Sequence, residues 1–332
     1  MDKSVSVIIP VFNASRTLER CLASVFAATY KNYEVVVVDD ASADDSVSIA
    51  GRFPCRLLRQ KENRGPAAAR NLGAREAKGE ILFFIDSDTE MFPETMETAV
   101  KTLSRPDIDA VVGVYAKEPL NKGFFPAYYC LLKHLSFTGQ RLQRHLVFAS
   151  HCAAIKRDAF FDVGGFKDFP WGMDIENEDL GRRLLVKYNI VMNADLQVKH
   201  HFAGFRKLLY IFNNRTYWWV KFFLKYKKFE PTLTTKSVGL ATVAGPAAFI
   251  MFLCALAFVK TPVFWLGFIL FFGLFLTGFL KFFAFVAREK GFLFGLSSFF
   301  ATWFFSFIIS YAAARAFLGN ILFFNRRENE CY

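Results

Sequence analysis

The sequence ILFFIDSD, at Ile81–Asp88, joins an apolar run to two carboxylates. An uninterrupted run of Ile, Leu and Phe is typical of a strand that is covered on both faces of a parallel sheet. Asp86 and Asp88 follow the run directly, and two carboxylates this close at a strand end can converge on one hard divalent cation. An acidic pair after a strand can also be a solvated turn. Its position at the end of a central strand favours the metal site.

On either side of this stretch the sequence alternates between strand and helix patterns. We predict strands at Ser4–Pro10, Tyr33–Asp39, Cys55–Arg59, Glu80–Asp86, Ile108–Tyr115, His145–Ile155 and Leu196–His200. We predict helices at Ala14–Ala28, Asp44–Phe53, Gly65–Ala77, Lys156–Val163 and Asn177–Lys187. This order indicates a doubly wound, mostly parallel α/β sheet, in which ligands bind beyond the C-terminal strand ends. The aromatic, poorly periodic region Leu120–Gly139 is expected to be a mobile or membrane-facing insertion.

Two further polar clusters follow predicted strands. Asp39 and Asp40 close the strand EVVVV, where a carboxylate can accept hydrogen bonds from a base or ribose; a cluster of helix N-caps explains them equally well. Arg64 precedes GPAAARNLG, whose small residues would let backbone N–H groups, with Arg64 or Arg70, approach phosphates. Tight helix packing through Ala and Gly is the alternative.

The composition changes along the chain. Most of the 42 Phe residues lie in the last third, and the formal net charge is +11. Basic residues crowd between Lys199 and Lys236, next to long apolar segments, and no nucleic-acid motif is present, so an anionic membrane surface is the expected partner rather than nucleic acid. The six cysteines show no metal-ligand spacing, which indicates free thiols in a reducing compartment. MDKSVSVIIP has no secretory signal pattern, so we expect a cytoplasmic N-terminal domain.

Three apolar stretches are long enough to cross a bilayer as helices, which takes roughly 20 residues each. They run over Ser237–Val259, Thr261–Val286 and Phe292–Ala314. The positive-inside tendency places the basic residues before the first stretch, and Arg288 and Lys290, on the cytoplasmic side. Three spans would then leave Arg326 and Arg327 outside, unless the last segment, Ala316–Phe324, re-enters or lies flat. Buried helices of a soluble protein are a weaker alternative, because these runs carry so little charge.

Four motifs together identify a family. VSVIIPVFN at Val5–Asn13, VVVVDDAS at Val35–Ser42, ENRGPAAARNLG at Glu62–Gly73 and FFIDSDT at Phe83–Thr89 resemble the family-two glycosyltransferases of the GT-A fold in order and spacing. GGF at Gly164–Phe166 and ENEDLGRRL at Glu176–Leu184 extend the resemblance to about His200. The resemblance implies transfer of a sugar from a nucleotide-diphosphate donor, with inversion, aided by Mg²⁺ or Mn²⁺.

The resemblance also implies roles for individual residues. Pro10 and Asn13 would line the nucleotide pocket, and Asp40 would contact the base. Arg64 and Arg70 lie where nucleotide or phosphate contacts are expected. Asp86 would serve both the diphosphate and the metal; Asp88, and with weaker support His200, would complete the metal site.

The expected general base is the point where the sequence departs from the family. The pattern there is Glu-Asp-x-Asp/Glu-Leu-x-x-Arg, but Asn177 occupies the presumed base position, and an amide cannot take a proton from a hydroxyl. Asp179 is our first choice of base, with Glu178 and Glu176 as alternatives. An ionised phosphate acceptor would need no base, so a polyprenyl-phosphate sugar synthase is the alternative function. A catalytically inactive membrane scaffold and a small transporter are the competing classes.

The segment Phe205–Phe229 mixes aromatic and basic residues as interfacial helices do. We therefore expect Arg215 and Trp218, together with Arg183, to serve a lipid-linked acceptor at the membrane. The predicted organisation is a glycosyltransferase domain (1–202), an interfacial segment (203–236), about three transmembrane helices (237–324) and a tail (325–332). The expected location is the inner cell membrane, with the catalytic domain on its cytoplasmic face.

Overall fold

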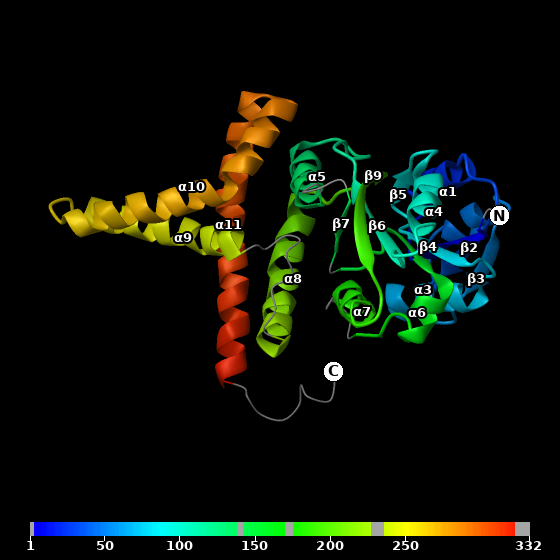
Figure 1. Ribbon diagram of the computed structural model, residues 1–332. Coiled ribbons are helices and arrows are strands. Elements are labelled where there is room, and N and C mark those ends of the chain that lie inside the picture. The colour runs from blue at the N-terminus through cyan, green and yellow to red at the C-terminus, as the bar shows by residue number, and fades with distance from the viewer. Residues whose placement is uncertain (1–2, 138–141, 146, 170–174, 227–235, 323–332) are drawn as a thin grey trace. The chain divides into compact units, whose positions relative to one another are not determined.

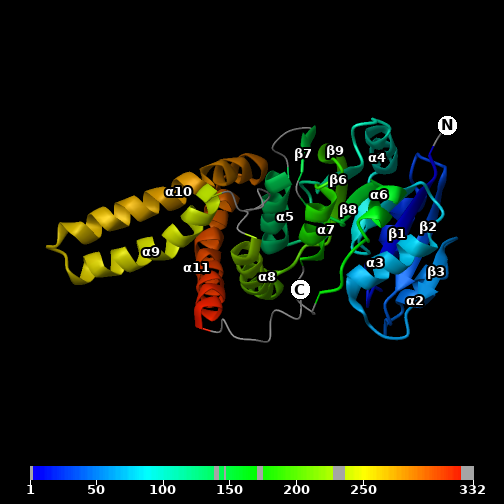
Figure 2. The same cartoon turned by 60° about the horizontal axis from the view of Figure 1, so that its bottom comes forward.

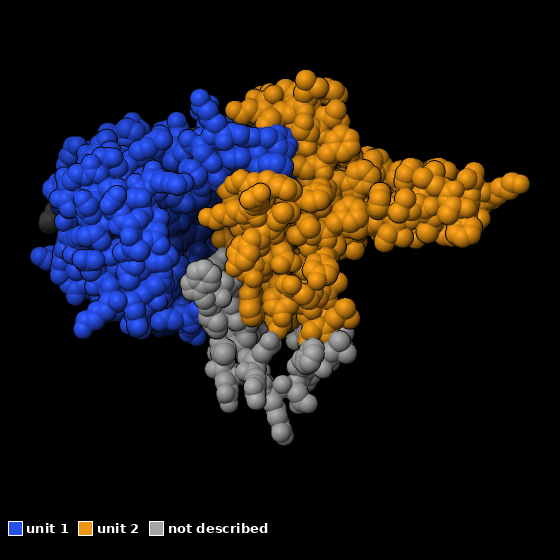
Figure 3. Space-filling model, turned by 180° about the vertical axis from the view of Figure 1, so that it is seen from behind, with its two compact units in different colours: residues 1–171, 175–202 blue, residues 172–174, 203–332 orange. Residues whose placement is uncertain are grey.

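The protein forms two compact units, which Figure 3 distinguishes by colour. The computed structural model describes residues 3–137, 142–145, 147–169, 175–226 and 236–322. The first unit ends at Phe202 and the second continues from Ala203. The expected tail, 325–332, lies outside the described residues, as do Lys227 and Lys228 in the basic segment.

One mixed sheet organises the first unit. Among the described residues its strand order is β3-β2-β1-β4-β8-β6-β9-β5, with β7 paired to β9 (Figure 1). The strands are β1 (Val5–Val11), β2 (Tyr33–Asp39), β3 (Arg56–Arg59), β4 (Ile81–Ile85), β5 (Thr89–Met91), β6 (Ala110–Tyr115), β7 (Leu142–Arg144), β8 (Cys152–Lys156) and β9 (Ile190–His200). β3, β2, β1 and β4 are parallel neighbours, as predicted. β8 is antiparallel to both β4 and β6, so the second half of the sheet departs from the parallel pattern.

Helices cover both faces of the sheet, which explains the continuous apolar strands (Figures 1 and 2). They are α1 (Leu18–Phe26), α2 (Ser46–Ala50), α3 (Gly65–Glu76), α4 (Thr95–Leu103), α5 (Phe124–Phe137), α6 (Arg157–Asp162) and α7 (Glu176–Leu184). Successive strand residues point to opposite faces. Val7 and Phe83 therefore pack in the cluster that contains α1 and α4 residues, whereas Ile8 and Phe84 pack with residues of α3, α6 and α7.

Two local predictions were wrong. The region expected to be a mobile or membrane-facing insertion contains α5, which packs on the sheet: Cys130 Sγ donates to the Ala116 carbonyl at 3.1 Å, and the Phe137 ring lies 6.0 Å from Tyr115. Its aromatic residues serve the core of the first unit. The strand expected from His145 begins only at Cys152, because the residues before it form a loop that is held by a hydrogen bond from Phe148 N–H to the α7 backbone.

The second unit is helical. It contains α8 (Phe205–Tyr226), α9 (Lys236–Ala257), α10 (Pro262–Lys290) and α11 (Phe292–Leu322). In the described part of the chain, three stretches are long and apolar enough to cross a membrane: Ser237–Ala257, Pro262–Lys290 and Phe292–Gly319. These are the three stretches that the sequence predicted.

Candidate functional site

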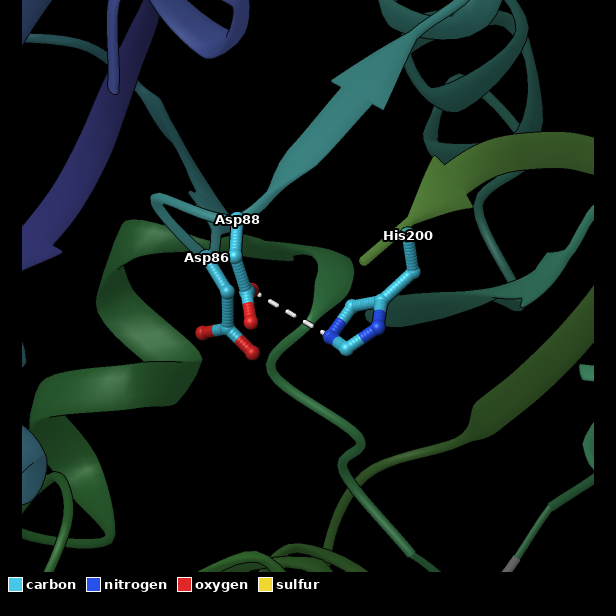
Figure 4. A group of neighbouring side chains, drawn as sticks. All are labelled: Asp86, Asp88 and His200. Atoms are coloured by element: carbon cyan, nitrogen blue, oxygen red, sulfur yellow. Dashed lines mark ion pairs between the residues drawn. The ribbon is translucent and has the colours of Figure 1, made fainter. Parts of the chain in front are cut away.

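Three side chains of types that can bind a metal, Asp86, Asp88 and His200, meet at the carboxyl end of β4 (Figure 4) and are called the metal-ligating cluster below. Thr89 closes the turn after β4, because its N–H and its hydroxyl both donate to the Asp86 carbonyl, at 3.1 and 2.7 Å. β5 then pairs with the end of β9, which puts Thr89 opposite His200. As a result, one ligand atom from each of Asp86, Asp88 and His200 lies within 4.8 Å of the others. His200 Nε2 is 3.2 Å from Asp88 Oδ1.

This donor set fits a divalent cation. Two carboxylates and one imidazole are offered, and all three side chains keep some exposure, so a ligand can reach them. The His200 ring packs against the rings of Tyr115 and Phe202, with centroids 5.2 and 4.8 Å away. Mg²⁺ prefers an all-oxygen shell, whereas a shell that includes imidazole suits transition metals better.

Arg70 connects the metal-ligating cluster to α7. It lies on α3, is buried, and donates from Nη2 to Asp86 Oδ1 at 2.8 Å and from Nη1 to Glu176 Oε1 at 3.4 Å. The Phe166 ring covers its guanidinium at 5.5 Å. Burial alone would lower the pKa of Arg70, but the two carboxylates outweigh it and raise that pKa. The guanidinium therefore stays charged and fixes the orientation of Asp86.

Asp40 lies at the N-terminus of α3. Its carboxylate accepts hydrogen bonds from the backbone N–H groups of Arg64 and Gly65, both at 2.8 Å, and from Gln60 Nε2 at 2.7 Å. Burial raises the pKa of Asp40 despite these donors. Asp40 therefore ties the end of β2 to the segment that carries Arg64, so two predicted nucleotide contacts are brought together.

Pro10 and Asn13 lie at the end of β1, beside the end of β2. Pro10 is paired with Val38 in the sheet. Asn13 adopts a left-handed backbone conformation, with φ of 49°. Its N–H donates to Ser42 Oγ and its side-chain oxygen accepts from Ala43 N–H, both at 2.9 Å. Asn13 thus joins the loops after β1 and β2, where the predicted nucleotide pocket begins.

The acidic residues of α7 have different surroundings. Asp179 is buried and paired with Arg183 Nε at 2.7 Å and Arg182 Nη2 at 3.6 Å. Arg183 also donates to the carbonyls of Val163 and Gly165, so it ties α7 to the turn after α6. The guanidinium of Arg183, which we predicted to contact the acceptor, is therefore already bonded to groups within the first unit.

Glu176 and Glu178 share the first turn of α7 with Asn177. Glu176 reaches the metal-ligating cluster through Arg70, and Glu178 is buried. Asn177 Oδ1 accepts a hydrogen bond from Ser150 N–H at 3.2 Å. The residue at the presumed base position thus fastens the loop before β8.

Sequence reasoning missed the residues behind His200. Tyr115 stacks on His151 with a centroid distance of 3.9 Å and an interplanar angle of 13°. His151 is buried, and its Nε2 has no hydrogen-bond partner in the described part of the chain. Burial lowers the pKa of His151 well below its usual value, so this ring is neutral. No pattern in the sequence connects these two strand-end residues.

Arg215 and Trp218, the remaining predicted acceptor residues, lie on α8 in the second unit. The Trp218 ring is 5.1 Å from that of Tyr217, and Lys221 Nζ lies 5.7 Å from the Trp218 ring.

Comparisons with known proteins give matches within the first unit. Residues 6–164 match the family described as Glycosyl transferase family 2. The chain is 33% identical over 133 residues to glycosyltransferase GlyG of Streptococcus pneumoniae, covering 39% of this chain and 44% of that protein. It is 39% identical over 116 residues to glycosyltransferase AglE of Haloferax volcanii, covering 33% of this chain and 38% of that protein. Each match thus spans less than half of the relative's own length.

A solved structure resembles most of the chain. The mannosyltransferase PcManGT from Pyrobaculum calidifontis, in complex with GDP-Man and Mn²⁺, superposes with a TM-score of 0.58 over 96% of this chain and 88% of that chain. Its sequence identity is 20%, so the likeness concerns the fold. The predicted family and fold class are confirmed: the first unit of this chain is a glycosyltransferase family 2 domain of the GT-A fold, followed by apolar helices that fit a membrane anchor.

Proposed function

We propose that this protein transfers a sugar from a nucleotide-diphosphate donor to a lipid-linked acceptor, with inversion and with the help of a divalent cation. The observation that carries the proposal is the convergence of Asp86, Asp88 and His200 within 4.8 Å, at the carboxyl edge of a family 2 domain. The solved protein of similar fold binds GDP-Man and Mn²⁺, which supports this donor class and a preference for Mn²⁺.

The residues around the cluster divide the work of binding. When bound by Asp86, Asp88 and His200, the cation would neutralise the donor diphosphate and ease its departure. Arg70 keeps Asp86 in place. The loops that Asn13 and Asp40 fasten together would form the nucleotide pocket, with Pro10 among its lining residues and Arg64 near the phosphates.

For an acceptor hydroxyl, we propose Glu176 as the general base in place of our first choice, Asp179. Both carboxylate oxygens of Asp179 face arginines within α7, and its side chain is 4% exposed. Glu176 is the carboxylate of α7 that Arg70 links to Asp86, with 14% of its side chain exposed. A base must lie within reach of the acceptor oxygen, which the position of Glu176 beside the metal-ligating cluster favours.

Asn177 favours a second candidate. Its amide oxygen is occupied by Ser150 N–H, so the position that would carry the base serves the fold. A phosphate acceptor is already ionised and needs no base. Transfer to a polyprenyl phosphate is therefore the alternative reaction at the same donor site.

The helices of the second unit support a location at a membrane. Its apolar helices would anchor the chain, and the basic residues near them would lie on the cytoplasmic face of the inner membrane. An acceptor with a lipid tail would then be supplied from that surface.

The test is donor turnover by the detergent-solubilised full chain, with a panel of nucleotide sugars, a lipid extract or a polyprenyl phosphate, and with or without Mn²⁺. We expect metal-dependent release of a nucleoside diphosphate that Asp88→Ala abolishes. Donor binding without turnover of any acceptor would favour an inactive scaffold. No donor binding at all would refute the proposed site.

Glu176→Gln and Asp179→Asn separate the two acceptor classes. With a hydroxyl acceptor we expect Glu176→Gln to lower kcat by about 10²–10⁴-fold, the usual contribution of a general base. Loss of that size with Asp179→Asn alone would return the role to Asp179. With a phosphate acceptor, Glu176→Gln should leave kcat within a few-fold of the wild-type value.

A further inference from the structure

α8 runs beside α11 from the middle of α11 onward. The Phe205 ring lies 5.9 Å from Phe304, and the Phe212 ring lies 4.8 Å from Phe305. Further along both helices, the Arg315 guanidinium carbon sits 4.7 Å from the centre of the Tyr217 ring. Residue numbers rise together on both helices, so they run side by side in the same direction, as Figures 1 and 2 show.

α9 and α10 form an antiparallel hairpin of a length that suits a bilayer. The rings of Phe258 and Phe264 are 5.6 Å apart at the turn, and those of Phe252 and Phe268 are 5.4 Å apart farther along both helices. Gly278 packs against Ala241 toward the other end of the hairpin. The apolar stretch Ser237–Ala257 has 21 residues. At 1.5 Å per residue it spans about 31 Å, close to the hydrocarbon thickness of about 30 Å.

α11 crosses this hairpin instead of running along it. Its contacts with α9 include Trp303 Nε1, which donates to the Gly245 carbonyl at 3.0 Å, and Ser310 Oγ, which donates to the Thr242 carbonyl at 3.4 Å. Both acceptors lie in the first half of α9, away from the hairpin turn. Figure 1 shows α11 and α8 lying across the direction of α9 and α10.

Charge decides which of these helices can lie in hydrocarbon. The sequence of α8 holds five basic residues and no acidic one: Arg206, Lys207, Arg215, Lys221 and Lys225. If α11 crossed the bilayer, the part of α8 beside it would enter the hydrocarbon with its cations, which is costly. α11 itself carries Arg315 and no acid. The hairpin, by contrast, has no charged residue between Ser237 and Val259 in α9 or between Thr261 and Leu280 in α10. Lys281 follows in the part of α10 that lies beside the start of α9, where Gly278 packs against Ala241.

We propose that α8 and the part of α11 beside it lie together in the headgroup layer, bound to anionic phospholipid headgroups, and that the α9–α10 hairpin alone crosses the bilayer. The inference takes membrane insertion from the proposed function and adds which helices cross. Lys260, at the hairpin turn, then faces the far side. Arg288, Lys290 and Arg315 stay on the catalytic side. This topology also removes the conflict between three spans and the basic pair Arg326–Arg327, since the chain after α11 remains on the cytoplasmic side.

Compartment-sensitive reporters on the full chain test the topology. One reporter is fused before Met1, one is inserted at Lys260, and one is fused after Tyr332. Each position is tested with a fluorescent protein that folds only in the cytoplasm and with a phosphatase that is active only outside it. We expect the Met1 and Tyr332 reporters on one side and the Lys260 reporter on the other. A Tyr332 reporter on the same side as that at Lys260 would overturn the inference while leaving membrane anchoring intact. A Lys260 reporter on the same side as that at Met1 would show that the hairpin does not cross and would also overturn the inference.

Lipid retention tests the headgroup contact independently of turnover. Full-length protein in nanodiscs of phosphatidylcholine is titrated with phosphatidylglycerol, and the retained anionic lipid is measured. Arg315→Gln should weaken phosphatidylglycerol binding about fivefold, the effect of one cation near an anionic surface. Lys101→Gln, which removes an exposed cation of α4 in the first unit, is the matched control and should change little. Equal effects of the two variants, or no effect of Arg315→Gln, would contradict the headgroup contact.

Discussion

Replacing Arg70 by Met removes the cation that two carboxylates share. The side chain of Arg70 is 6% exposed, while those of Asp86 and Glu176 are 27% and 14% exposed. Breaking a fully buried pair costs about 3–5 kcal/mol, because the remaining charge is left without a partner. Asp86 keeps enough exposure to regain some water, so we expect a loss of about 2–3 kcal/mol. For a unit of this size each kcal/mol lowers the unfolding midpoint by about 2–4 °C.

The assay is thermal unfolding of the full chain in detergent, followed by circular dichroism, with and without Mn²⁺. Arg75→Met on the same helix is the control, because Arg75 is exposed. Arg70→Met should lower the midpoint by about 4–12 °C and Arg75→Met by about 1–2 °C at most. Mn²⁺ should restore part of the loss, because a cation beside Asp86 replaces the missing charge. Equal midpoints for the two variants would refute the bridging role of Arg70.

Three further outcomes follow from the first unit. Burial lowers the pKa of His145 to about 4. The stability that neutral His145 contributes is therefore complete above its unfolded pKa of about 6.5 and is lost as the pH falls toward 4. His145→Phe should weaken this pH dependence in urea titrations, and an unchanged pH dependence would contradict the contribution of His145. A Cβ at Gly73 would lie 2.6 Å from Ile8 Cγ2, so Gly73→Ala should cost about 1–3 kcal/mol in the same titrations, and a stabilised variant would show that α3 can shift. His200→Asp should move the turnover preference from Mn²⁺ toward Mg²⁺, because it replaces imidazole with oxygen; an unchanged preference would remove His200 from the metal site.

Much of the fold was predictable because its signals are local. Apolar runs such as Ile81–Ile85 and Tyr33–Asp39 specify buried strands on their own, and Asp86 and Asp88 follow the central strand in sequence as well as in space. The antiparallel insertion of β8 between β4 and β6 could not be read in the same way. Strand order in that half depends on contacts between segments far apart in the chain, and a strand pattern does not state its neighbours.

In the candidate site, too, individual residues could be predicted from the sequence, whereas their contacts could not. Arg70 and Asp86 were predicted, but their hydrogen bond, and the bond between Arg70 and Glu176, depend on how α3 and α7 pack on the sheet. His200 was expected only by resemblance, since the short pairing of β5 with β9 brings it to Asp88 across 111 intervening positions. Aromatic residues of α5 suggested a membrane contact because composition does not distinguish one apolar environment from another.

Direct binding of Mn²⁺ tests the central claim, that Asp86, Asp88 and His200 form the metal site of a nucleotide-sugar transferase. Free Mn²⁺ is measured by electron paramagnetic resonance while the full chain is titrated, with and without a nucleoside diphosphate. We predict one bound Mn²⁺ per chain, tighter binding when the diphosphate is present, and loss of that binding in Asp88→Ala. Equal Mn²⁺ binding by the wild-type chain and Asp88→Ala would contradict the account.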